Sequence, residues 1–408
     1  MEVDSGGGLL LITLGVVLMV GPLLKGFCQR FGVPVAVGYI LLGVVIGWFI
    51  RLWDTDIPLM FNGVFAVLAQ LGIVALLFRV GLRSHTKQLL EKLPNASVIW
   101  IGNVLGSLAA GYLVARYGLG WSVETSLVVG TAFSATSIAV SLAVWDELGL
   151  AGSDAGETLL DVAELDDLSA AVFLAVLLGT LPVLLNGGQG LWTQVGASFV
   201  GILFKLALFV GGCYLFAHFL EARFTQFNRQ LSAAPTSLAI AILGVGLTIA
   251  AIAGFLGFSI AIGALFAGLA FSRDPEAVHS DAGFSYFYDL LTPFFFIHIG
   301  MQTDLSVLFS AIDVGLVLFV VAVLSKIIFT VLPALLSMNR GDALRLGVSM
   351  IPRAEIALVV IYECRAIDER LVSPEVFAGM VLVTLATCIA SPVMLRRLLV
   401  SGSSSRPS

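Results

Sequence analysis

The sequence predicts an all-α polytopic membrane protein with about thirteen transmembrane helices. Three observations support this fold class: the composition, the number of long apolar segments and the placement of the basic residues. The chain has 408 residues, of which 59% are hydrophobic and 12% are charged, and its mean hydropathy is +1.03. Soluble domains carry about 25% charged residues, so this chain has too little polar surface to cover a water-soluble globule.

Thirteen segments are apolar enough and long enough to cross a bilayer, given that a helical span needs about 20 mostly apolar residues. The break between the eighth and ninth segments is short and consists of Gly254-Phe255-Leu256-Gly257. The predicted spans lie near residues 8–27, 34–51, 60–82, 96–116, 122–145, 156–182, 191–220, 236–254, 256–272, 286–302, 310–336, 343–364 and 375–398.

The basic residues give the predicted spans a direction. Cytoplasmic loops of membrane proteins are enriched in Lys and Arg. With the N-terminus outside, 14 of the 21 basic residues fall on the inner side, four fall on the outer side, and Lys205, Lys326 and Arg353 lie within spans. The acidic N-terminus lacks the basic region of a signal peptide. The sequence therefore predicts a multi-pass protein of the cell (inner) membrane, with its N-terminus outside and its C-terminus in the cytoplasm.

Two parts of the chain resemble each other at an offset of 219 residues. Leu77–Leu82 ends the third span and matches Phe296–Met301, which ends the tenth. These two spans run in opposite directions, so the relation is an inverted repeat. We expect two inverted repeats of six spans joined by a linker span. Many secondary transporters have this architecture, with the binding site at the bilayer midplane.

The same offset relates Ser134 and Thr136 to Arg353 and Glu355. Both regions interrupt an apolar span with polar residues. Pro352 has no N–H and breaks a helical hydrogen-bond ladder, while clustered Ser and Thr can satisfy the freed backbone groups. Spans 5 and 12 are therefore predicted to be discontinuous helices that cross at the membrane centre. Their half-helix ends would offer partial charges to an ion.

Carboxylates within span 6 give the strongest functional signal. Glu157, Asp161, Glu164 and Asp167 are spaced four, three and three residues apart, which places them on one helix face. Charges at membrane depth cost at least ~2.5–3.5 kcal/mol each and usually mark function. The stripe predicts an acidic funnel that opens to the cytoplasm, with Asp167 deepest. Asp166 points about 100° away from this face and needs another partner.

Two cations within spans need counter-charges. Lys326 lies in the middle of span 11 and is the predicted partner of Asp166, because a lone buried ammonium would lose its proton or acquire a counter-ion. Arg353 cannot lose its proton and also requires a carboxylate. Three carboxylates could supply it: Glu355, Glu164 and Asp161. For Arg353 and Glu355, a purely structural ion pair and direct participation in transport both remain open.

Taken together, these residues resemble the monovalent cation/proton antiporter superfamily, in the branch that holds bacterial sodium/proton antiporters and the membrane domains of potassium-efflux systems. The resemblance covers nearly the whole chain. Its markers are Gly38–Gly43, Leu77-Phe78 with Gly81-Leu82, Ser134–Ser137, Asp166-Asp167, Gly263 through Gly268-Leu269, Phe294–Phe296 with Ile299–Met301, and Pro352–Glu355.

The resemblance implies one transmembrane transporter unit over residues 1–400, followed by a short disordered cytoplasmic tail at 401–408. Within it, an interface part (8–82 and 236–302) would form a homodimer, and a core part (96–182 and 310–398) would hold the crossed helices. The linker span would lie at about 191–220. Potassium-efflux relatives often carry a nucleotide-binding tail, and none is expected in this chain.

The resemblance also implies roles for the site residues. Asp167 would carry the cation and the proton in alternation, and Asp166 would pair with Lys326. Thr136 and Ser137 would sit at the unwound crossing. Asp167, Asp166 and Thr136 are the predicted oxygen ligands of a monovalent cation. Members with two adjacent aspartates are generally electrogenic and move two protons per cation. Glu164 departs from the family pattern, in which this position is usually apolar.

The sequence thus predicts a secondary active antiporter that exchanges protons for a monovalent cation, with sodium preferred, by alternating access. Nucleic acid is not an expected partner, since the chain has no basic cluster and its basic and aromatic residues do not interleave. No cofactor is expected either. Membrane lipid and a second copy of the chain are the expected partners. A potassium/proton antiporter or potassium-efflux subunit, a sodium-coupled solute symporter and a channel remain open. An intramembrane aspartyl protease is disfavoured, because its two aspartates must face each other from different helices.

Overall fold

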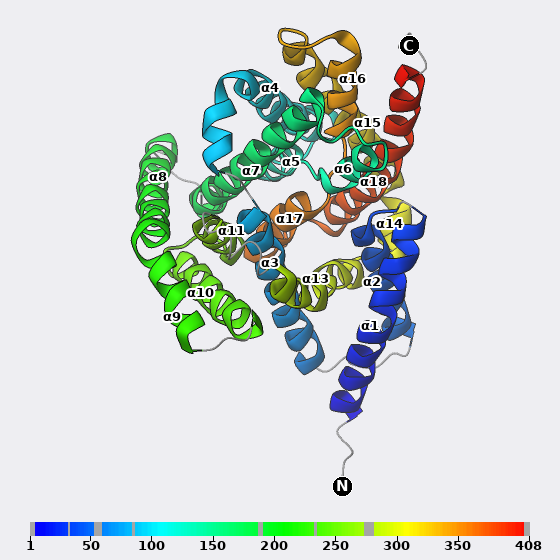
Figure 1. Ribbon diagram of the computed structural model, residues 1–408. Coiled ribbons are helices and arrows are strands. Elements are labelled where there is room, and N and C mark those ends of the chain that lie inside the picture. The colour runs from blue at the N-terminus through cyan, green and yellow to red at the C-terminus, as the bar shows by residue number, and fades with distance from the viewer. Residues whose placement is uncertain are drawn as a thin grey trace. The chain divides into compact units, whose positions relative to one another are not determined.

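The computed structural model describes residues 5–31, 33–52, 59–83, 86–186, 191–231, 235–272 and 281–403. Every regular element in these ranges is a helix (Figure 1). The elements are α1 (Ser5–Arg30), α2 (Val35–Leu52), α3 (Leu59–Arg83), α4 (Thr86–Leu113), the π-helix η1 (Val114–Gly118), α5 (Val123–Ser134), α6 (Ala139–Glu147), α7 (Asp154–Asn186), α8 (Leu191–Leu215), the π-helix η2 (Phe216–Leu220), α9 (Glu221–Leu231), α10 (Pro235–Phe255), α11 (Ile260–Phe271), α13 (Asp281–Gln302), α14 (Leu305–Ser310), α15 (Ile312–Ala334), α16 (Arg340–Ser349), α17 (Glu355–Ile367) and α18 (Pro374–Ser403).

Within these ranges, eight helices are long and apolar enough to cross a membrane, and two shorter apolar helices lie at Val35–Arg51 and Ile260–Phe271. The chain is therefore an all-helical polytopic membrane protein, as predicted. The count of thirteen spans stays a prediction. A span that is interrupted consists of two short helices, and neither is long enough to be counted as crossing a membrane. This is the case for the α5–α6 and α16–α17 segments, whose helices have 12, 9, 10 and 13 residues.

The chain divides into two compact units. The first comprises Met1–Leu23, Tyr39–Gln88 and Leu178–Gln302, and the second comprises Leu24–Gly38, Leu89–Leu177 and Thr303–Ser408. The first unit includes most of the predicted interface part together with the linker helix α8, and the second includes most of the predicted core part. Their roles as interface and core stay predictions. Of the predicted tail, residues 401–403 continue α18, and 404–408 lie outside the described residues.

Two close helix crossings, each at a pair of glycines, hold the first unit together. Gly43 of α2 faces Gly300 of α13, and Gly81 of α3 faces Gly268 of α11. At all four positions, a Cβ atom would overlap the backbone carbonyl oxygen three residues before the facing glycine. The two crossings therefore have the same local geometry. Because Gly81 and Gly300 are related by the 219-residue offset, this equivalence supports the predicted inverted repeat.

Replacing Gly81 or Gly300 with alanine is expected to destabilise the protein by about 2 kcal/mol, because the added methyl group would force two packed backbones apart. Thermal melting followed by fluorescence-detected size exclusion checks this. Gly212→Ala and Gly244→Ala are matched controls, since a Cβ at either position has nothing within 4 Å. Equal melting temperatures for the crossing variants and the controls would show that these contacts are not tight.

The second unit is organised around two interrupted helices. α5 ends at Ser134 and α6 begins at Ala139, while α16 ends at Ser349 and α17 begins at Glu355. These interruptions lie at the positions predicted for spans 5 and 12. The two breaks contact each other directly, since the backbone N–H of Ser137 donates to the Pro352 carbonyl at 2.8 Å.

Side chains from neighbouring helices satisfy the backbone groups that the second break frees. The N–H of Arg353 donates to the Thr387 hydroxyl of α18 at 3.2 Å. The Ser141 hydroxyl of α6 donates to the Ser349 carbonyl at 2.7 Å. The Trp145 indole holds the side chain of the same residue, since it donates to the Ser349 hydroxyl at 2.9 Å. Hydroxyl groups can replace the lost helical bonds in a lipid-buried helix, so the break is an ordered part of the unit.

Candidate cation site

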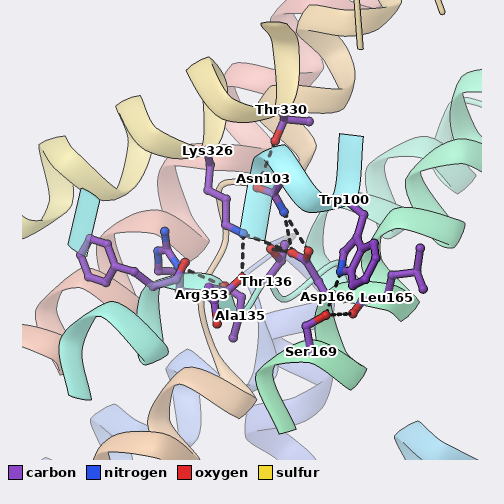
Figure 2. A network of polar contacts seen from close by, with 12 residues as sticks. Trp100, Asn103, Ala135, Thr136, Leu165, Asp166, Ser169, Lys326, Thr330 and Arg353 are labelled. Atoms are coloured by element: carbon purple, nitrogen blue, oxygen red, sulfur yellow. Dashed lines mark hydrogen bonds and ion pairs between the residues drawn. The ribbon is translucent and has the colours of Figure 1, made fainter. Parts of the chain in front are cut away.

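The first aspartate of the pair is enclosed by polar partners. Asp166 of α7 is 0% exposed. The Asn103 amide of α4 donates to both of its oxygens, at 2.9 and 2.7 Å. The Thr136 hydroxyl donates to Oδ2 at 2.6 Å, and the Lys326 ammonium contacts the same oxygen at 3.1 Å (Figure 2). The structure thus brings Asp166 and Lys326 together as predicted, and the extra hydrogen bonds offset the cost of burying the ion pair.

Lys326 also neutralises the end of an interrupted helix. Its side chain is 0% exposed, and its ammonium donates to the Ser134 carbonyl at 2.9 Å. Ser134 is the last residue of α5, where the unpaired carbonyls carry a partial negative charge. The lysine therefore compensates the Asp166 carboxylate and the C-terminus of α5 together.

The structure gives Arg353 backbone carbonyls in place of the predicted carboxylate. Its guanidinium donates to the carbonyls of Ala132 at 3.4 Å, of Ala135 at 3.1 Å, and of Phe133, and lies 4.3 Å from the centre of the Phe133 ring. Within the described ranges, no carboxylate forms an ion pair with it. The physical reason is the broken helix: several orphan carbonyls converge at its end, and the Arg353 Nη1 atom lies within hydrogen-bond distance of three of them.

The second aspartate has different surroundings. Asp167 is partly exposed, and it has no hydrogen bond or ion pair with any residue that the structure describes. The charged groups that act on it are the carboxylates of Asp166, Glu355 and Glu164 and the ammonium of Lys326. Three negative groups and one positive group thus act on a carboxylate that has no bonded partner among the described residues, and this balance attracts a cation.

The hydroxyl groups at the first break are used unequally. The Thr136 hydroxyl is occupied by Asp166, and the Ser134 hydroxyl donates to the Thr131 carbonyl at 2.7 Å. The Ser137 hydroxyl is buried, and the described part of the chain offers it no hydrogen-bond partner. Thr136, the hydroxyl predicted as a cation ligand, is thus occupied by Asp166, and Ser137 is the hydroxyl of this break that is left available for a cation.

An acidic cavity of about 620 Å³ lies at the start of α7. Its lining includes Asp154, Glu157 and Asp161 of α7 and Asp342 of α16. Two members of the predicted funnel thus face a cavity, together with two carboxylates that the sequence did not single out. The lining stops at Asp161 and does not include Glu164 or Asp167. A funnel that continues to Asp167 stays a prediction.

Sequence reasoning missed two contributors to the site. Asn103 holds Asp166, and Thr330 donates to the Asn103 amide oxygen at 3.1 Å. The signal for the first was an amide in the middle of an otherwise apolar span, Ile101-Gly102-Asn103-Val104. The signal for the second was a hydroxyl one helical turn after Lys326. Neither residue carries a charge, so the pattern of charges within the spans does not mark either of them.

Known proteins are similar to this chain in sequence and in fold. The sequence pattern described as sodium/hydrogen exchanger, transmembrane, matches residues 15–401. The high-affinity Na(+)/H(+) antiporter NhaS3 of Synechocystis is 26% identical over 342 residues, which cover 82% of this chain and 71% of that protein. An Na(+)/H(+) antiporter of Enterococcus hirae is 26% identical over 377 residues, covering 90% and 92%. The solved structure of the sodium proton antiporter MjNhaP1 from Methanocaldococcus jannaschii superposes with a TM-score of 0.70 at 17% identity, over 98% of both chains.

The structural likeness shows a shared fold, and it agrees with the all-helical architecture described above. The sequence match is the stronger statement about ancestry, because it extends over almost the full length, from within the first helix, α1, to within the last, α18. On that ground the chain belongs to the family of transmembrane sodium/hydrogen exchangers, which are transporters and not enzymes.

Proposed function

We propose that this chain exchanges protons for sodium across the cell membrane by alternating access, and that Asp167 binds the cation and the proton in turn. The observation that carries the proposal is the contrast within the carboxylate pair. Asp166 is enclosed by Asn103, Thr136 and Lys326, whereas Asp167 is partly exposed and has no partner among the described residues. An open carboxylate can hold a proton or a dehydrated cation but not both, and that competition couples the two fluxes.

Sodium takes oxygen ligands. The proposal assigns to it the Asp167 carboxylate and the unpaired Ser137 hydroxyl, joined by the Asp166 carboxylate once this leaves Lys326. Glu164 and Glu355 act on Asp167 through their charge, and they raise the local concentration of cations. In this scheme the acidic cavity around Asp161 collects cations from the cytoplasm.

The lysine supplies a second proton. When a cation binds, Asp166 turns from Lys326 toward it, and the abandoned ammonium releases its proton because an unpaired charge is costly in a buried position. Two protons then move for each cation, and the exchange carries net charge. We also propose, as the sequence predicts, that the protein is a homodimer in the inner membrane, with the N-terminus outside and the C-terminus in the cytoplasm.

Reconstitution into proteoliposomes tests this function. Sodium, lithium or potassium is added across pH 6–9 while a pH-sensitive dye reports proton movement. We expect sodium to drive proton movement at the lowest half-saturating concentration. A stronger response to potassium would make potassium the transported cation, and an absence of proton movement with all three would overturn the assignment.

A further inference from the structure

Asn103 lies between the carboxylate of Asp166 and the helix that carries Lys326. Its side chain is 0% exposed, and it belongs to α4, which packs closely on α15. Gly102 and Gly106 flank it on α4, and a Cβ at either position would press against Phe329 or Pro333 of α15. This close approach brings Asn103 within reach of Thr330.

The hydrogen bonds of Asn103 fix the direction of its amide. Thr330 donates to the Asn103 Oδ1 atom at 3.1 Å, and the Asn103 Nδ2 atom donates to both oxygens of Asp166 (Figure 2). An ionised carboxylate only accepts hydrogen bonds. The amide in this orientation therefore serves the ionised form of Asp166, and the reverse orientation would set oxygen against oxygen.

Two residues of α15 therefore stabilise the position of the Asp166 carboxylate. Lys326 contacts the carboxylate directly, and Thr330 reaches it through Asn103 from one helical turn further along. The charged groups that interact electrostatically with Asp166 are Lys326 from α15, Arg353 from the break before α17, and Asp167 from α7 itself. The groups that α4 and α5 contribute, Asn103 and Thr136, are neutral.

We propose that Asn103 is a positioning residue that sets how readily Asp166 exchanges Lys326 for a cation. This inference rests on the proposed function. Each hydrogen bond from Asn103 stabilises the state in which Asp166 faces the lysine, and a cation must displace these bonds to recruit Asp166. Asn103 thereby weakens cation binding and strengthens the hold on the lysine proton.

Removing the hydrogen bonds that Asn103 donates to Asp166 should strengthen cation binding. In Asn103→Leu, the half-saturating sodium concentration is expected to fall about tenfold, which corresponds to one hydrogen bond to a charged group. Half-maximal exchange is expected at lower pH, since the lysine proton is released more easily. Thr330→Val keeps the shape but leaves the Asn103 amide without its donor, and a change of about threefold in the same direction is expected. Thr330→Ser should restore wild-type behaviour.

Ser107→Ala is the matched control. Ser107 lies on α4 one turn after Asn103, is 0% exposed, and its hydroxyl has no partner within the described ranges. Its removal should leave both the sodium dependence and the pH profile unchanged.

The experiment measures sodium dependence in two ways for the wild type and these variants: by exchange in proteoliposomes, and by sodium-induced thermal stabilisation of the purified protein. Lower half-saturating sodium in both Asn103→Leu and Thr330→Val supports the inference. An unchanged or higher value in Thr330→Val, or a lower maximal rate with unmoved sodium and pH dependence, overturns it. A wild type that shows neither exchange nor sodium stabilisation would overturn the proposed function itself, and the inference with it.

Discussion

Cation/proton exchange is expected to disappear when Asp167 is replaced by asparagine, with sodium-dependent proton movement falling at least about 100-fold. The amide has the size of the carboxylate but can neither bind a proton nor neutralise a cation in a low-dielectric site, where such a contact is worth several kcal/mol. The fold should persist, because Asp167 has no hydrogen bond or ion pair to lose among the described residues. Dye-monitored exchange in proteoliposomes measures the effect.

Asp313→Asn is the matched control, since Asp313 is an exposed carboxylate in the first turn of α15. This variant should exchange like the wild type. Undiminished exchange in Asp167→Asn, at equal amounts of reconstituted protein, would remove Asp167 from the transport site.

The second large effect is expected in Lys326→Ala, as a loss of the net charge that each exchange cycle moves across the membrane. The variant should still exchange protons for cations, but the net charge carried per cation should fall, because the second proton is lost. Asp166 would keep its bonds from Asn103 and Thr136, while its charge would lose its buried partner. Breaking a buried ion pair costs about 3–5 kcal/mol, so the variant should also melt at a lower temperature.

Currents on a solid-supported membrane, divided by the dye-measured proton flux, give the net charge carried per proton, which falls together with the net charge per cation. Lys205→Ala is the control, since Lys205 is an exposed lysine of α8 with no part in the proposed site. A ratio that is the same in Lys326→Ala and the wild type would exclude the lysine as the carrier of the second proton.

The sequence was sufficient for those features of the site that depend on charge and on backbone chemistry. A buried ammonium needs a counter-ion, which led from Lys326 to Asp166, and a proline among hydroxyls within an apolar span indicated the break at Pro352. Helical spacing separated Asp166 from Asp167 by about 100°. The structure gives these two carboxylates different surroundings, one enclosed and one open.

The remaining contacts of the site could be identified only from the structure, because the residue type of a hydrogen-bond partner does not reveal it in the sequence. Arg353 binds backbone carbonyls, which every residue possesses, so no sequence pattern distinguishes them from other carbonyls. Asn103 and Thr330 are neutral and lie 227 positions apart in the chain, and only the approach of α4 to α15 brings them together.

The glycines of the helix crossings could likewise be predicted from the sequence only in part. Gly43, Gly81, Gly268 and Gly300 all stood out in the sequence as parts of glycine-containing markers. Which glycine faces which could not be derived, because a small residue indicates a close approach without naming the opposite helix. The pairing follows only from the packed structure.

In the proposed mechanism, Asp167 binds the cation in competition with a proton, and Asp166 pairs with Lys326 until the cation binds. Proton release on addition of sodium to the purified protein, in weakly buffered solution with a pH indicator, tests it most directly. We expect release from the wild type, none from Asp167→Asn, and a smaller but measurable release from Asp166→Asn. Full release from Asp167→Asn together with none from Asp166→Asn would contradict the claim.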